Sequence, residues 1–170
     1  MNNIENTVIS LLQKEERDEI AAAVLKQLDT TSAALQEKAA GMENPQDYLN
    51  LIRYLIRETG VYMTSSNHLD EVLTQPKNIE SAFVSLTDND EFKGRAKEEM
   101  RRLPRFMAMS ILCGAETAAA DKSAEIVKGM NPEAEHFVSG LADIYHGYMQ
   151  DALSYGRGED KKASVIGTME

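Results

Sequence analysis

Cysteine, tryptophan and long apolar runs are scarce or missing in this sequence. Its 170 residues include one cysteine, Cys113, and no tryptophan. One cysteine cannot form a disulfide within the chain, and a lone thiol in an acidic chain fits a reducing compartment. The longest apolar stretch, Phe106 to Ala115, is interrupted by Ser110 and falls far short of the roughly 20 residues that span a bilayer. The first residues also lack the basic and apolar regions of a secretory signal, so we predict a cytoplasmic protein.

Positive charge is also in deficit. Lys and Arg number 18 against 28 Asp and Glu, and the formal net charge is −10. Nucleic-acid binding relies on clustered cations that release counterions from the phosphates. The charge balance therefore argues against general nucleic-acid binding and against broad adhesion to anionic membranes.

Strand patterns are absent as well. No stretch alternates apolar and polar residues convincingly, and β-branched residues are not gathered between turn residues. Apolar residues instead recur every three or four positions, the spacing of a helix with one buried face. We predict an all-α fold, an antiparallel multi-helix bundle of about six or seven helices. Globin-like packing without haem is the alternative, because none of the three histidines lies where a central proximal helix would fall.

The length and composition predict one folded unit. With 42% apolar residues the chain can build a core, and 170 residues is an ordinary size for one domain. We place the helical domain at residues 1–155. Residues 156–170 combine glycines and mixed charges with little apolar content, which predicts a flexible C-terminal tail.

Glycine and proline divide the domain into predicted helices. Pro45 and Pro132 each follow an asparagine, a pairing typical of helix starts. Gly41, Gly60 and Gly129 are predicted to end helices, and Pro104 either kinks a helix or begins the next one. The positions predicted to face the core are Ile4, Val8, Leu11, Leu12, Ile20, Val24, Leu28, Leu35, Ala39, Leu49, Ile52, Leu55, Ile56, Leu69, Val72, Leu73, Ile79, Phe83, Leu86, Phe92, Ala96, Met100, Leu103, Met107, Ile111, Ala115, Ala118, Ala119, Phe137, Leu141, Ile144 and Tyr148.

Two pairs of an acidic residue and a histidine have a spacing that suits metal ligands. Glu133 and His136 are three residues apart, as in the ligand pairs of di-iron helical bundles, and Asp143 and His146 repeat this spacing. The two pairs are about 80° out of phase on one helix, so they do not converge on one ion. Glu133 also follows Pro132, in a first helical turn where the helix dipole alone favours an acid. Glu133 and His136 are therefore weak metal candidates, and we predict no catalytic residue and no cofactor.

Basic residues are concentrated in one short segment. Residues 93–105 hold six of the 18 Lys and Arg together with two Glu, a net charge of +4 that leaves −14 for the remainder. Four of the six recur every four residues and form a continuous stripe only if the helix survives Pro104. Methionines and a phenylalanine follow directly, and flexible apolar side chains beside arginines are typical of binding surfaces. The predicted partner-binding residues are Lys93, Lys97, Arg101, Arg102, Arg105, Phe106 and Met109.

These observations favour a non-catalytic protein-interaction module, such as an adaptor, regulator, inhibitor or assembly subunit. An acidic protein helix or a phosphorylated ligand suits the basic segment better than a duplex does. The alternative role of that segment is structural, with aliphatic stems covering apolar surface and charged ends in water. Alanine-rich stretches at 21–23 and 118–120 allow close helix approach, from which we predict a homo-oligomer.

Two other functions stay open from the sequence. One is a metal-binding bundle enzyme that uses the carboxylate of Glu133 and the imidazole of His136. The other is a sensor that holds an apolar small molecule between helices near Met107 and Tyr145, a common location for ligands in helical bundles.

Overall fold

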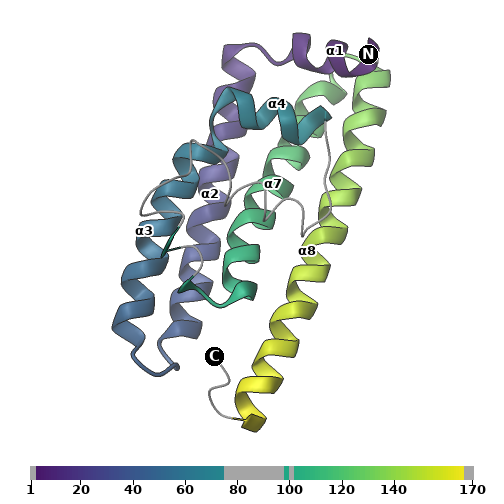
Figure 1. Ribbon diagram of the computed structural model, residues 1–170. Helices are drawn as coiled ribbons and strands as arrows, with labels where there is room; N and C mark the ends of the chain where they lie inside the picture. Colours follow the sequence, from purple (N-terminus) through teal and green to yellow (C-terminus); the bar gives the residue numbers. More distant parts are fainter. Residues whose placement is uncertain (1–2, 75–97, 100–101, 167–170) are drawn as a thin grey trace.

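The computed structural model describes residues 3–74, 98–99 and 102–166. Helices make up most of this described backbone, and no strand occurs in it. The all-α prediction is therefore confirmed. Six helices, α1 to α4, α7 and α8, are delimited in the described part (Figure 1). The predicted helices around Ile79 to Leu86 and from Asp88 to Leu103 fall largely outside the described residues.

Two helices form the N-terminal part of the bundle. α1 spans Asn3–Leu11 and α2 spans Lys14–Ala39. At the start of α2, the backbone N–H of Gln13 donates to Glu16 Oε1 over 3.0 Å. This contact satisfies an amide that has no acceptor within the helix. The apolar residues predicted to be buried along α2, from Ile20 to Ala39, are buried.

The next two helices follow a turn whose position was predicted correctly, although the residue predicted to be left-handed in it was wrong. α3 spans Pro45–Met63 and α4 spans Ser66–Thr74. The left-handed residue between α2 and α3 is Asn44, with φ of 56°, whereas Ala40 at the end of α2 is right-handed. Asparagine adopts this region more readily than most residues other than glycine. The turn therefore depends on Asn44 and not on a left-handed Gly41.

The last two helices are long and pack against each other. α7 spans Arg105–Lys128 and α8 spans Pro132–Ile166. Gly129 follows the end of α7 as predicted, and Asn131 Oδ1 accepts a hydrogen bond from the backbone N–H of Ala134 over 3.0 Å. α8 continues through most of the segment predicted to be a flexible tail. Its backbone there is helical, and its flexibility stays a prediction.

Antiparallel packing of α2, α3, α7 and α8 forms the body of the bundle (Figure 1). Arg53 Nε on α3 donates to Gln36 Oε1 near the end of α2 over 3.2 Å, and Gly60, later in α3, lies against Leu25 and Leu28, earlier in α2, so the two helices run in opposite directions. Thr117 Oγ1 on α7 donates to the carbonyl oxygen of Tyr145 on α8 over 3.2 Å. The short helices α1 and α4 lie crosswise near the end at which α2 begins and α3 ends.

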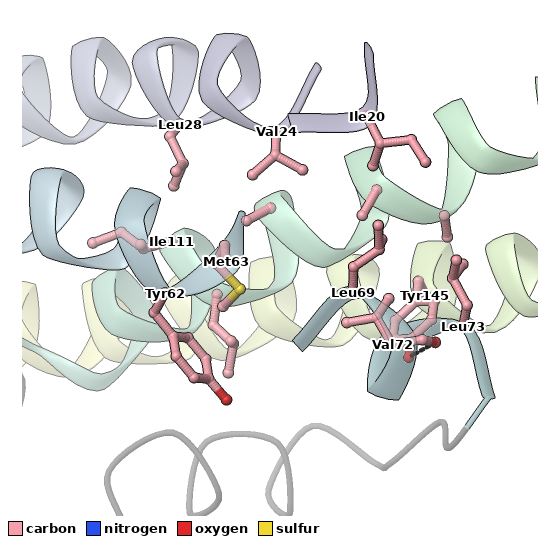
Figure 2. Close-up of a cluster of buried hydrophobic side chains, with 14 of the residues drawn as sticks. Ile20, Val24, Leu28, Tyr62, Met63, Leu69, Val72, Leu73, Ile111 and Tyr145 are labelled. Atoms are coloured by element: carbon pink, nitrogen blue, oxygen red, sulfur yellow. Dashed lines mark hydrogen bonds between the residues drawn. The ribbon is translucent and has the colours of Figure 1, made fainter. Parts of the chain in front are cut away.

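One apolar core joins all six helices. Figure 2 shows part of it, where Leu69, Val72 and Leu73 of α4 gather with Tyr145 of α8. Burial of such side chains is the main stabilising term for a bundle of this kind. In the described part of the chain, no helix is both long enough and apolar enough to cross a bilayer.

Gly60 does not end α3, contrary to the prediction. The helix continues to Met63, and Gly60 is buried against α2. A Cβ atom at Gly60 would lie 3.2 Å from Leu25 Cδ2 and 3.6 Å from Leu28 Cδ1. The missing side chain therefore serves close approach of two helices, which a local sequence pattern does not distinguish from a helix stop.

The buried face of α8 is also rotated relative to the prediction. Ile144, predicted to face the core, is 42% exposed, whereas the next residue, Tyr145, is buried. The buried positions follow the series from Ala134 through Val138 and Leu141. This series has helical spacing too, so periodicity alone did not decide between the two faces.

Candidate functional site

The predicted basic stripe is broken at Pro104. Pro104 is the N-cap of α7, with φ of −52° and ψ of 140°, so its backbone is extended. Arg102, which is helical, thus belongs to a different helix from Arg105, the first residue of α7. Lys93, Lys97 and Arg101 lie outside the described residues. Proline disfavours helical backbone in the residue before it, which explains the break.

Arg102 is the basic side chain of this segment that the structure describes. Its side chain is 63% exposed, and Nη1 lies 3.0 Å from Glu99 Oε1. The Glu99 side chain is 15% exposed, so the pair joins an exposed guanidinium to a largely buried carboxylate. The guanidinium is therefore accessible to a partner while it remains paired with Glu99.

Phe106 and Met109 lie in the core of the described structure. Phe106 packs in the main core, and the ammonium Nζ of Lys38, in the last turn of α2, lies 5.1 Å from its ring centroid. Met109 is fully buried in a smaller cluster with Cys113, packed against Tyr148 and Met149. Both predicted contact residues are thus placed to anchor α7 rather than to present a surface.

The start of α7 combines a helix N-terminus with a basic residue. Its first turn contains no acidic residue, and its first residue is Arg105. The N-terminal end of a helix carries a partial positive charge of its own, which cations nearby reinforce. We use the name basic end for Lys38, Arg102 and Arg105 together with the neighbouring Lys93, Lys97 and Arg101 of the sequence.

The two weak metal candidates lie on the surface. Glu133 and His136 are both exposed on α8. His146, in the second acid–histidine pair of the sequence, lies 2.9 Å from Asp121 of α7 through Nε2. Within the described ranges, no group of three or more His, Cys, Asp or Glu side chains could hold a metal ion.

A buried polar cluster lies beneath α4, and sequence analysis missed it. His68 Nε2 on α4 lies 3.4 Å from Glu116 Oε2 on α7, and each side chain is only 9% exposed. The ring of Tyr62, from α3, lies 4.4 Å from the His68 ring, centroid to centroid. Within the described part, neither ring nitrogen of His68 forms a hydrogen bond, so the contact with Glu116 is an ion pair that lacks hydrogen-bond geometry. The imidazole and the carboxylate therefore depend mainly on each other for electrostatic compensation.

Tyr145 forms a second polar contact to α4. Its hydroxyl donates to the carbonyl oxygen of Val72 over 2.6 Å (Figure 2). Burial, and then the negative charge of Glu116, raise the pKa of Tyr145 well above its ordinary value. The phenol is therefore neutral, and remains a hydrogen-bond donor, at every pH at which the protein would be studied. Met107 and Tyr145, the centre of the predicted ligand site, are both core residues here.

An ion pair makes a third contact to α4. Arg17 Nη2, near the start of α2, lies 2.9 Å from Asp70 Oδ1, and Arg17 Nε donates to the carbonyl oxygen of Leu12 over 2.7 Å. The described contacts thus connect α4 by polar side chains to α2, α7 and α8. We call Arg17–Asp70, His68–Glu116 and Tyr145–Val72 the α4 contacts.

One signal in the sequence could have drawn attention to this cluster. Glu116 is the one charged residue between Phe106 and Ala120, in a helix that is otherwise apolar over that stretch. Burying a charge is costly unless it is paired, so such a residue requires a partner. The partner is His68, which lies 48 positions away in the sequence. The packing of α4 on α7 brings the two residues together.

Comparison of the chain with protein-family models, with curated proteins and with solved structures gives no match in any of the three.

Proposed function

We propose that the protein is a helical interaction module whose basic end docks an acidic segment of a partner protein. The observation that carries the proposal is the position of Lys38, whose ammonium lies 5.1 Å from the Phe106 ring. This contact brings a cation from α2 to the point where residues 93–105 lead into α7. Lys38 therefore lies beside the first turn of α7, the helix that follows residues 93–105 in the sequence.

Charge favours an acidic partner segment over other occupants. The basic end is a local excess of positive charge on a chain whose net charge is −10. An acidic helix is attracted to such a site and is held away from the remainder of the surface, which favours one orientation. Placing cations at the start of α7 also opposes its dipole, a cost in stability that docking of an anion would relieve.

Reversing charge at the basic end is expected to abolish partner capture without unfolding the protein. In the variant Arg102→Glu/Arg105→Glu, the acid at position 105 suits the N-terminus of α7, whereas the acid at position 102 loses the ion pair with Glu99. These two effects oppose each other, so the free energy of unfolding should change by less than about 1 kcal/mol. Capture of the specific partner from the native host should fall at least about tenfold, since several desolvated charge pairs are reversed. Quantitative mass spectrometry of the eluate and urea unfolding measure the two effects.

The matched control lies at the other end of the same helix. Lys122→Glu/Lys128→Glu changes the net charge by the same amount near the C-terminus of α7. It should leave capture unchanged and lower the free energy of unfolding slightly, because acids there oppose the dipole. Equal loss of capture in both variants would mean that overall charge, and not the basic end, governs binding.

Self-association is a separate prediction, through the outer face of α2 and α3. Leu25 is 46% exposed and Val61 is 72% exposed. Leu25 contacts the buried Gly60, the residue that precedes Val61 in the sequence. We expect light scattering over a concentration series to give a mass above that of one chain. Leu25→Lys/Val61→Lys should return the mass to that of a monomer, because a second copy could no longer bury this apolar surface. A strict monomer at high concentration for the unchanged protein would refute the prediction.

A further inference from the structure

We propose that Met109, Cys113 and Met149 form a binding site for a soft monovalent metal ion, Cu(I). We call these three residues the sulfur cluster. Met109 and Cys113 of α7 are buried together in a cluster that is separate from the main core, and Met149 of α8 packs against it. The site is independent of docking at the basic end.

A hydrogen bond between α7 and α8 fixes how these residues line up. Thr117 Oγ1 donates to the carbonyl oxygen of Tyr145 over 3.2 Å, so residues 117 and 145 lie at the same level of two antiparallel helices (Figure 1). One turn back along α7 leads to Cys113, and one turn forward along α8 leads to Met149. Cys113 and Met149 therefore lie at the same level as well.

Met109 faces the same side of α7 as Cys113. Four residues separate the two, which is about one helical turn. Met107, only two residues before Met109, faces the opposite side of α7 and is buried in the main core instead. Methionine side chains are long and flexible, so both thioether sulfurs can approach the Cys113 thiol. Three sulfur atoms from two helices are thus within reach of one ion.

The chemistry of these donors selects the ion. Thiolate and thioether sulfurs are soft ligands that favour Cu(I), whereas Mg²⁺, Ca²⁺ and Mn²⁺ prefer oxygen ligands. The sulfur cluster and the adjacent Tyr148 include no carboxylate and no imidazole. Methionine lies outside the set of His, Cys, Asp and Glu side chains, which form no metal-binding group of three or more in the described ranges.

Burial favours a monovalent ion over a divalent one. Met109 is fully buried and Cys113 is 2% exposed, so a net charge at this position is costly. On binding, the Cys113 thiol releases its proton to water and its sulfur donates an electron pair to Cu(I), while each thioether donates an electron pair without losing a proton. One thiolate and one Cu(I) are neutral together, and no oxidation state changes. Zn²⁺ at the same donors would leave a net positive charge.

Met149 gives the ion access to the site. Its side chain is only partly buried, whereas Met109 and Cys113 are enclosed. An ion from solvent therefore meets the Met149 thioether first.

Competition with the Cu(I) chelator bicinchoninate tests the site, with the full chain in anaerobic buffer and ascorbate as the reductant. The unchanged chain should retain one Cu(I), and X-ray absorption should show sulfur ligands alone. Met109→Leu and Met149→Leu conserve side-chain volume. Each should weaken Cu(I) binding at least about tenfold, because each removes a donor. Cys113→Ala should abolish the binding.

The matched control is Met107→Leu. It makes the same change on the same helix at a fully buried methionine, but on the side that faces the main core. Cu(I) affinity should stay as in the unchanged chain, and circular dichroism checks that every variant is folded.

Two results would overturn the proposal. One is failure of the unchanged chain to retain Cu(I) against the chelator. The other is equal Cu(I) affinity in Met107→Leu, Met109→Leu and Met149→Leu, which would place the ion at exposed methionines such as Met130. Should Cys113→Ala not fold, Met149→Leu, which alters a partly buried side chain, must still weaken the binding.

Discussion

Replacing His68 with leucine is expected to lower the free energy of unfolding by about 3–5 kcal/mol at neutral pH. The substitution fills much of the space of the imidazole but leaves the Glu116 carboxylate, 9% exposed, without its partner at 3.4 Å. A buried charge without a partner is among the few causes of such a large effect from one substitution. Urea unfolding followed by circular dichroism measures the loss.

The matched control removes both partners. His68→Leu/Glu116→Leu leaves no charge to compensate, so it should recover most of the stability lost in His68→Leu. Glu116→Leu alone should be less harmful than His68→Leu at neutral pH, since a lone imidazole can be buried neutral. A loss below about 1 kcal/mol in His68→Leu, or a double variant as unstable as the two losses combined, would contradict an energetic link between the residues.

Replacing Gly114 with leucine should destabilise the bundle by about 1–3 kcal/mol or more. Gly114 lies on the side of α7 that faces α2, where a Cβ atom would be 3.2 Å from Thr31 Oγ1 and 3.5 Å from Gln27 Nε2. A full leucine side chain must separate the two helices or displace both polar side chains. Thermal unfolding should show a lower midpoint, and the helical signal below the transition should be retained.

The same substitution at Gly140 is the control, and it should change the free energy of unfolding in the opposite direction. Gly140 lies on the exposed side of α8, and nothing lies within 4 Å of the position a Cβ atom would take. Leucine is a far better helix former than glycine, so Gly140→Leu should raise the free energy of unfolding by about 0.5–1 kcal/mol. Equal effects at both positions would show that Gly114 does not mediate close contact between α2 and α7.

Local patterns were sufficient for most of the fold. The buried series on α2 and the apolar face of α4 follow directly from helical spacing, and Asn131 with Pro132 begins α8 as predicted. These features depend on residues within one or two turns of each other. Gly60 shows where this reasoning ends, because a glycine selected for contact with another helix looks the same in sequence as one that ends a helix.

The sites were less predictable, because they depend on which helices meet. Composition identified the basic segment, but the effect of Pro104 on it needed the backbone. Phe106 and Met109 have the residue types of a binding surface and also of a core, and in the described structure they lie in the core. The pairing of His68 with Glu116 depends on contact between α4 and α7, which no spacing within one helix encodes.

Cross-linking of the captured complex tests docking at the basic end most directly. A lysine-reactive reagent applied to the protein with its bound partner samples Lys38 together with Lys93 and Lys97 of the basic segment, and seven further lysines that include Lys14, Lys122 and Lys128. The proposed function predicts that cross-links to the partner concentrate on Lys38, Lys93 and Lys97 and join them to an acidic region of the partner. Cross-links confined to the other seven lysines would contradict it.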